Sequence, residues 1–110
     1  MKRKPQIGVM GSAADLKYGP EIEKLAYESG ELVAEAGSDV GYAADKACGS
    51  VSTAASRGAK SAGGITVGIT YGQGKDIWDK EGTTDIIIPT GLGRGGGREY
   101  VLVSSCDAII

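Results

Sequence analysis

The stretch that decides the fold is DIIIPTGLGRGGGREYVLVSSCDAII, residues 85–110. A run of isoleucines at residues 86–88 leads into a glycine tract, and a second apolar segment closes the stretch at residues 107–110. The unbroken isoleucine run predicts a strand buried on both faces. Residues 98–106 contain Val-Leu-Val, which favours a strand. Because they lie between two strand-like segments, we predict a helix there instead.

The rest of the chain also alternates strand-like and helix-like segments. Short apolar or β-branched runs predict strands at residues 6–10, 39–44 and 65–71. Two helices are predicted between them, over residues 19–37 and 50–64. This order predicts a parallel sheet with helices on both of its faces.

The helix ends carry the residues expected of them. Pro20 suits the first turn of the first helix and Gly37 the position just past its end, while Ser50 is the expected cap of the second helix. The apolar residues of the first helix recur on one predicted face: Ile22, Leu25, Ala26, Val33 and Ala36.

The composition of the chain argues against several classes of function. A chain of 110 residues with a net charge of −2 indicates one domain with no nucleic-acid partner, since its basic residues cluster only at Lys2–Lys4. No apolar run approaches the ~18 residues that span a bilayer, so we expect no membrane association. The absence of His argues against a metal site of the usual kind. The cysteines form no disulfide pattern, so we expect a cytoplasmic protein with Cys106 in its core.

The glycine tract has the spacing G-x-G-x-x-G at Gly91, Gly93 and Gly96. A dinucleotide fingerprint follows the first strand of its unit and needs an acidic residue about 20 positions on, whereas this tract follows the fourth predicted strand. That position excludes the fingerprint. The tract is then either a cradle for one phosphate, flanked by Arg94 and Arg98, or a mobile surface loop whose arginines are solvated. The residues alone leave both open.

Four segments carry a resemblance: IGVMGSA, LVAEAG, STAASRGAKSAGGITVGI and DIIIPTGLGRGGGREYVLVSSCDAII. In this order they resemble the Rossmann-like nucleotide-binding family that includes the molybdenum-cofactor carrier proteins and the LONELY GUY phosphoribohydrolases, often mislabelled lysine decarboxylases. The likeness covers nearly the whole chain and is closer to the carrier branch. It implies one α/β domain over residues 1–110, a three-layer Rossmann-like parallel sheet of about five strands with helices on both faces.

The resemblance also implies a phosphate-binding or ligand-binding site at the carboxyl edge of the sheet. Gly11 and Ser12 match the family's first phosphate loop, and Thr90 and Gly91 match the turn after the fourth strand. Arg98 falls where the hydrolases hold a substrate-gripping arginine. The alternatives are a capping role for Ser12 and a solvated helix-start position for Arg98.

Two departures from the family pattern bear on activity. The second loop, usually Y-G-G-G, reads YAADKACG, and the methyl groups of Ala43 and Ala44 and the carboxylate of Asp45 oppose a close phosphate. In this loop only Gly49 remains as a glycine that allows a phosphate to approach the backbone. The chain also ends before the family motif P-G-G-x-G-T-x-x-E, which holds the catalytic Glu of the hydrolases. We therefore expect a C-terminally incomplete domain with no catalytic residue.

These features predict a carrier-like, non-catalytic protein that binds a phosphorylated small molecule, either a nucleotide or a molybdopterin-type cofactor. One alternative is a nucleoside 5′-monophosphate phosphoribohydrolase. The other is a truncated fragment whose only properties are folding and self-association. Because an incomplete sheet exposes apolar surface and a strand edge, we expect a homo-oligomer, a dimer or larger.

Overall fold

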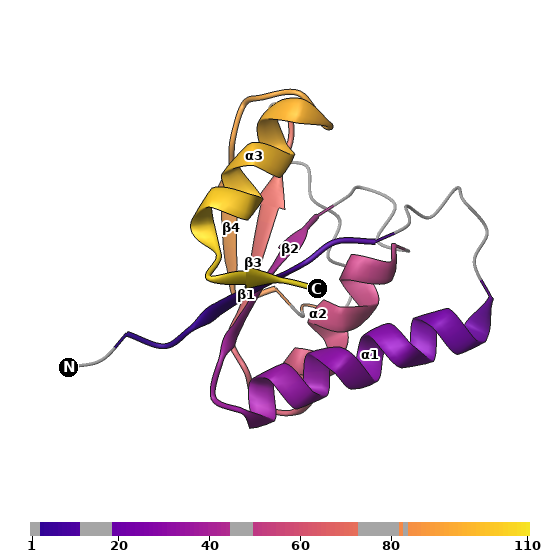
Figure 1. Ribbon diagram of the computed structural model, residues 1–110. Helices are drawn as coiled ribbons and strands as arrows, with labels where there is room; N and C mark the ends of the chain where they lie inside the picture. Colours follow the sequence, from indigo (N-terminus) through magenta and orange to yellow (C-terminus); the bar gives the residue numbers. More distant parts are fainter. Residues whose placement is uncertain (1–2, 12–18, 45–49, 73–81, 83) are drawn as a thin grey trace.

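The computed structural model describes residues 3–11, 19–44, 50–72, 82 and 84–110, which form one parallel sheet with helices on both faces (Figure 1). The strands are β1 Gln6–Val9, β2 Asp39–Ala43, β3 Thr66–Thr70, β4 Ile86–Pro89 and β5 Ala108–Ile109. The helices are α1 Pro20–Glu35, α2 Val51–Ser61 and α3 Gly96–Ser105. The strand order is β4-β3-β2-β1-β5, and every neighbouring pair is parallel. The predicted α/β fold is confirmed, including the helix in the ambiguous segment.

The predicted helix ends are also confirmed. Pro20 occupies the first turn of α1, and Gly37 follows its end with a φ of 83°, a conformation that favours glycine. The side chain of Ser50 caps α2 by accepting a hydrogen bond from the backbone N–H of Thr53 at 3.1 Å. Local chemistry therefore sets where these helices begin and end.

The helices divide between the two faces of the sheet. α1 and α2 cover one face and α3 covers the other (Figure 1). The core under α1 and α2 consists of small and β-branched side chains: Val9, Ala26, Val40, Ala54, Ala55 and Ala59. Under α3, Leu102 is fully buried. A side chain on Gly41 of β2 would contact both Leu102 and Cys106. Cys106 itself is only partly buried, so the prediction of a core cysteine is only partly met.

α1 and α2 approach each other at two glycines. A Cβ atom on Gly30 would lie 1.9 Å from the carbonyl oxygen of Ala55, and one on Gly58 would lie 1.9 Å from that of Tyr27. The two backbones are therefore in direct contact. This contact corrects the predicted apolar face of α1, because Gly30 is buried while Leu25 is 61% exposed. α2 packs against the smallest side chains of α1 rather than the largest.

The prediction that the isoleucine run is buried on both faces is wrong. Ile86, Ile87 and Ile88 are 49%, 45% and 41% exposed. The reason is that β4 lies at the edge of the sheet and pairs only with β3, while α3 packs mainly over β1, β2 and β3. Apolar content alone does not tell an edge strand from a central one.

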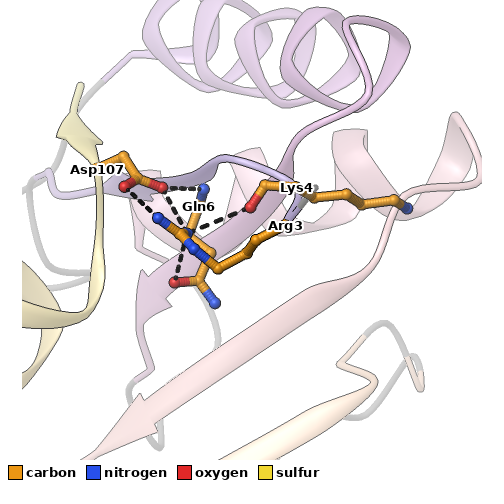
Figure 2. A network of polar contacts seen from close by, with 4 residues as sticks. All are labelled: Arg3, Lys4, Gln6 and Asp107. Carbon is orange, nitrogen blue, oxygen red and sulfur yellow. Dashed lines mark hydrogen bonds and ion pairs between the residues drawn. The ribbon is translucent and has the colours of Figure 1, made fainter. Parts of the chain in front are cut away.

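Aspartates begin strands along the amino edge of the sheet. Asp107 precedes β5, and its carboxylate accepts two hydrogen bonds from Arg3 and one from the backbone N–H of Gln6, each 2.8 Å long (Figure 2). Asp85 precedes β4, where it pairs with Lys60 and accepts a hydrogen bond from the backbone N–H of Thr66 at 2.9 Å. These contacts fix the outer strands to their neighbours and engage Arg3 and Lys60 in ion pairs.

Among the helices that the structure describes, none is long and apolar enough to cross a membrane.

Candidate functional site

The carboxyl ends of the parallel strands meet at the edge opposite the aspartates. Chain segments leave the sheet there, and the amino ends of α2 and α3 return to it. Among the described residues, Met10 and Gly11 follow β1 and Ala44 follows β2. Tyr71 and Gly72 follow β3, and Thr90 and Gly91 follow β4. Parallel sheets bind their ligands at this edge.

Gly11 contacts the beginning of α2. A Cβ atom on Gly11 would lie 2.7 Å from the Cβ and Cγ1 atoms of Val51, so this position requires glycine for packing. Beside Val51, the hydroxyl of Ser50 lies 2.9 Å from that of Ser52 and 2.8 Å from that of Thr53. Gly11 therefore lies at the positive end of the α2 dipole. Ser12 and Gly49, the other loop positions predicted to bind phosphate, lie outside the described residues.

The turn after β4 is braced against the end of β3. The hydroxyl of Thr90 donates a hydrogen bond to the carbonyl of Thr70 at 2.7 Å and accepts one from the backbone N–H of Leu92 at 3.2 Å. Gly91 has a φ of 70°, and the N–H of Gly72 donates to the carbonyl of Leu92 at 2.8 Å. The hydroxyl group of Thr90 thus donates its hydrogen bond to the backbone, and Gly91 adopts the left-handed conformation that the turn requires.

The glycine tract continues this ordered turn into α3. The N–H of Arg98 donates to the carbonyl of Gly93 at 2.9 Å. A Cβ atom on Gly97 would lie 2.3 Å from the Cβ of Leu92, so glycine lets the helix begin close to the turn. Arg98 is only 6% exposed. The alternative of a surface loop with solvated arginines is therefore wrong for Arg98, although Arg94 is exposed.

Arg98 joins the ends of two central strands. Its Nη1 donates to the carbonyl of Ala44, just past β2, at 2.8 Å, and its Nε donates to the carboxylate of Glu99 at 2.6 Å. Its Cζ lies 5.4 Å from the ring centre of Tyr71, just past β3. The Cζ of Arg94 lies 5.7 Å from the same ring centre. Two guanidinium groups and one aromatic ring thus gather at the carboxyl edge.

The steric objection predicted for Ala44 is wrong. Ala44 is 1% exposed, and its methyl group lies in the interior, 3.3 Å from where a Cβ atom on Gly68 of β3 would stand. The methyl group therefore does not face the open edge, and the carbonyl of Ala44 is engaged by Arg98. The predicted effect of Asp45 falls outside the described residues.

The structure places Thr90 and Gly91 in the turn after β4 and Arg98 in the first turn of α3, and it places Gly11 at the beginning of α2. The sequence analysis missed Tyr71 as a partner of the arginines. A usable signal was present, because Tyr71 stands at the carboxyl end of a clear strand and directly before a glycine. The carbonyl of Ala44 has no such signal, because every residue carries one.

Two hollows lined by described residues lie elsewhere. One lies between α3 and strands β2, β3 and β4 and includes Ile86, Ile88 and Leu102. The other lies beside α1 and includes Leu32 and Ile110. Both are mainly apolar and neither is lined by a cation, so they do not suit a phosphate. The described parts of the chain hold no group of three or more His, Cys, Asp or Glu residues placed to bind a metal ion.

Comparison with known proteins gives a family and a set of solved folds. The sequence model of the family described as LDcluster4, SLOG cluster4 family, matches residues 4–110. An uncharacterized protein of Archaeoglobus fulgidus is 36% identical over 105 residues, which are 96% of this chain and 62% of that protein.

Several similar solved structures are described as carrier or binding proteins for the molybdenum cofactor. The structure of the molybdenum cofactor carrier protein of Chlamydomonas reinhardtii superposes with a TM-score of 0.81 at 33% identity, over 97% of this chain and 61% of that one. The molybdenum cofactor binding protein of the phototrophic bacterium Rippkaea orientalis gives a TM-score of 0.83 at 35% identity, over 99% and 62%. The chain thus spans less than two thirds of the length of these relatives.

Proposed function

This chain belongs to the SLOG cluster4 family, and from that membership and the geometry of its carboxyl edge we propose that it binds a phosphorylated small molecule as a non-catalytic carrier. The ligand class we favour is the molybdenum cofactor, whose pterin bears a phosphate monoester. A nucleotide monophosphate is the second ligand of the same chemistry.

The observation that carries the proposal is the position of Arg98. Its guanidinium is nearly buried at the carboxyl edge, where Nη1 donates to the carbonyl of Ala44 and Nε to the carboxylate of Glu99. A guanidinium binds phosphate through two N–H groups at once. Burial strengthens such a bond, because less water competes for the charge.

The distribution of charge supports the same edge. At the amino edge, Arg3 and Lys60 are engaged by Asp107 and Asp85. At the carboxyl edge, Arg94 and Arg98 lie near the beginning of α3, whose backbone N–H groups add a positive partial charge. Glu99 offsets part of the charge of Arg98. Among the described residues, the carboxyl edge thus brings two guanidinium groups close to the amino end of a helix.

The six predicted positions take different parts in this proposal. Gly11, Gly91 and Arg98 serve the ligand directly, through backbone N–H groups and one guanidinium. Thr90 holds the turn, because its hydroxyl is engaged by the backbone of β3. Ser12 and Gly49 stay predictions.

Equilibrium dialysis tests the proposal. The purified chain is dialysed against molybdenum cofactor and, separately, against AMP, with the exposed variant Lys24→Ala as a matched control for Arg98→Lys. We expect Lys24→Ala to bind like the wild type. Arg98→Lys should bind at least about tenfold more weakly, because lysine keeps the charge but loses the fork of N–H groups. No binding of either ligand at millimolar concentration would reject the proposal.

The same mixtures separate a carrier from an enzyme. A carrier returns AMP unchanged, whereas a phosphoribohydrolase releases adenine and ribose 5-phosphate. Chromatography of the dialysate after a long incubation measures the free base. Steady release of adenine by the wild type, abolished in Arg98→Lys, would replace the carrier function with hydrolysis.

The proposal also includes location and assembly. We place the carrier in the cytoplasm, because its two cysteines form no disulfide pattern. We propose a homo-oligomer, because the exposed isoleucines of the edge strand β4 offer an apolar surface to a second copy. Light scattering of the purified chain measures its mass in solution. A mass equal to that of one chain at micromolar concentration would contradict the assembly.

A further inference from the structure

Helix α1 presents a row of apolar side chains to solvent. Ile22, Leu25 and Leu32 are 45%, 61% and 65% exposed. The side of α1 that faces the fold is a different one and includes the buried Ala26 and Gly30. The exposed row therefore lies outside the core. Contiguous apolar surface of this kind is typical of sites where another molecule binds.

The row has the spacing of a seam between two helices. Its members follow one another at intervals of three and four residues over two heptads, and we call them the α1 stripe: Ile22, Leu25, Ser29, Leu32 and Ala36. The hydroxyl of Ser29 donates to the carbonyl of Leu25 at 2.8 Å, so this polar member is satisfied within the helix. A stripe with this repeat suits a second helix laid along it.

A hollow beside the α1 stripe has room for a large side chain. Its lining from the stripe is Ser29, Leu32 and Ala36, and from the strand side it includes Ile7 and Ile110. The side chains of Ser29 and Ala36 are small, so the hollow stays open between α1 and the strands. Helices that pack on such a seam insert one large apolar side chain into each hollow.

An acidic rim follows the α1 stripe on the side away from the sheet. Glu21, Glu28 and Glu35 are exposed and stand seven residues apart, so they lie on one line beside the stripe. Lys24 lies 3.8 Å from the carboxylate of Glu28. In the part of the chain that the structure describes, Glu21 and Glu35 form no ion pair. The rim therefore carries a net negative charge.

We propose that the α1 stripe is a docking surface for a basic amphipathic helix of a partner protein. The apolar face of that helix lies on the stripe, and its lysines or arginines pair with the acidic rim. Charges beside a helix seam set the choice of partner. This surface lies on α1, away from the carboxyl edge, so the inference does not depend on the proposed ligand.

Two other occupants fit the charges less well. A second copy laid antiparallel would bring the same glutamates against the rim, and one laid parallel would bring Ala26 and Val33, which carry no charge. An anionic membrane surface attracts basic segments, and the rim is acidic. Only a basic partner complements both the stripe and the rim.

Two designed helical peptides of equal length test the choice of charge. Both have leucine at the seam positions of a heptad repeat, and the flanking positions are lysine in one and glutamate in the other. Like charges keep each peptide from pairing with itself. Fluorescence anisotropy with the whole chain should show the lysine peptide binding at least about tenfold more tightly, with a smaller difference in high salt. Equal affinities for the two peptides would overturn the inference.

Glu35→Lys and Glu31→Lys form a matched pair of variants. Glu35 belongs to the rim, whereas Glu31 lies on another side of α1. Glu35→Lys should weaken binding of the lysine peptide about fivefold and strengthen binding of the glutamate peptide, and Glu31→Lys should change either by less than about twofold. Leu32→Ala should weaken both peptides about tenfold, because it removes apolar contact area. Equal effects of Glu35→Lys and Glu31→Lys, or wild-type affinity in Leu32→Ala, would contradict the docking surface.

The variant Leu32→Glu decides between the three occupants. It should abolish binding of the lysine peptide and leave the mass of the chain in light scattering unchanged. Self-association that is lost in Leu32→Glu would assign the α1 stripe to a second copy and overturn the inference. Sedimentation of the wild type, but not of Leu32→Glu, with phosphatidylglycerol vesicles would assign it to a membrane and overturn it too.

Discussion

The guanidinium of Arg98 donates a hydrogen bond to the carbonyl oxygen of Ala44 at 2.8 Å, across 54 positions of sequence. This bond joins the first turn of α3 to the end of β2, two elements on which the carboxyl edge is built. Arg98 therefore contributes to the stability of the fold as well as to the proposed ligand site. Stability and binding both depend on it, and the two effects have to be measured separately.

Removing the side chain of Arg98 should destabilise the fold. Arg98→Ala leaves the carbonyl of Ala44 without its partner in a buried place, and such a loss costs about 1–3 kcal/mol of unfolding free energy. Urea denaturation followed by circular dichroism measures it. Lys24→Ala is the matched control and should change the free energy of unfolding by less than about 0.5 kcal/mol, because the side chain of Lys24 is 78% exposed. Equal midpoints for wild type and Arg98→Ala would show that the bond does not stabilise the fold.

Gly30→Ala should destabilise the protein although alanine is the better helix former. Intrinsic propensity favours alanine by about 1 kcal/mol. The added methyl group would meet the carbonyl oxygen of Ala55 at 1.9 Å, and backbone cannot move aside as a side chain does. We expect a net loss of about 3 kcal/mol or more by urea denaturation.

The control for Gly30 is Gly96→Ala at the beginning of α3, where an added Cβ atom meets nothing within 4 Å. That variant should be neutral or slightly more stable than the wild type. If both variants have the same midpoint, the direct backbone contact between α1 and α2 is absent in solution.

Stability should fall in acid because of the aspartates at the amino edge. The Arg3 guanidinium holds the pKa of the Asp107 carboxyl well below its usual range, and the hydrogen bond from Lys60 lowers the pKa of Asp85. A folded-state pKa below the unfolded value of about 3.9 stabilises the fold above that pH. The stabilisation is lost as the pH falls towards the folded-state value.

Thermal melting between pH 2 and pH 7 measures this loss. Asp107→Asn should melt at a lower temperature than the wild type at pH 7, and the difference should shrink as the pH falls below about 4. A difference that is constant across the whole range would mean that the charge of Asp107 does not stabilise the fold.

Gly91 should resist substitution for conformational reasons. Its φ of 70° lies in the left-handed region, where a Cβ atom costs about 1–2 kcal/mol. Gly91→Ala should therefore weaken AMP binding in equilibrium dialysis, because it disturbs the turn between β4 and α3. The control is Gly93→Ala, where the added atom meets open space. Loss of binding in Gly93→Ala but not in Gly91→Ala would contradict this role for the turn.

The fold was predictable from the sequence because its signals are local. Pro20, Gly37 and Ser50 mark helix ends through their own backbone or side-chain chemistry. The alternation of β-branched runs with longer amphipathic segments predicts a parallel sheet. Even the Val-Leu-Val segment of α3 followed from its place between two strands.

The errors concern properties that depend on neighbours. The isoleucines of β4 resemble a central strand, and only the strand order makes them an edge. The burial of Gly30 and the exposure of Leu25 follow from the approach of α2, which the pattern of α1 does not contain. The pairing of Tyr71 with Arg98 needs β2, β3 and α3 in place together, so the sequence suggested the arginine but not the ring that it contacts.

The most direct test of ligand binding at the carboxyl edge is an amide NMR titration of the ¹⁵N-labelled chain, first with AMP and then with molybdenum cofactor. The account predicts saturable shifts concentrated at Tyr71, Gly91 and Arg98, with the amides of Asp85 and Asp107 unchanged. Shifts confined to the amino edge or to the apolar hollow under α3, or no shifts at millimolar ligand, would contradict it.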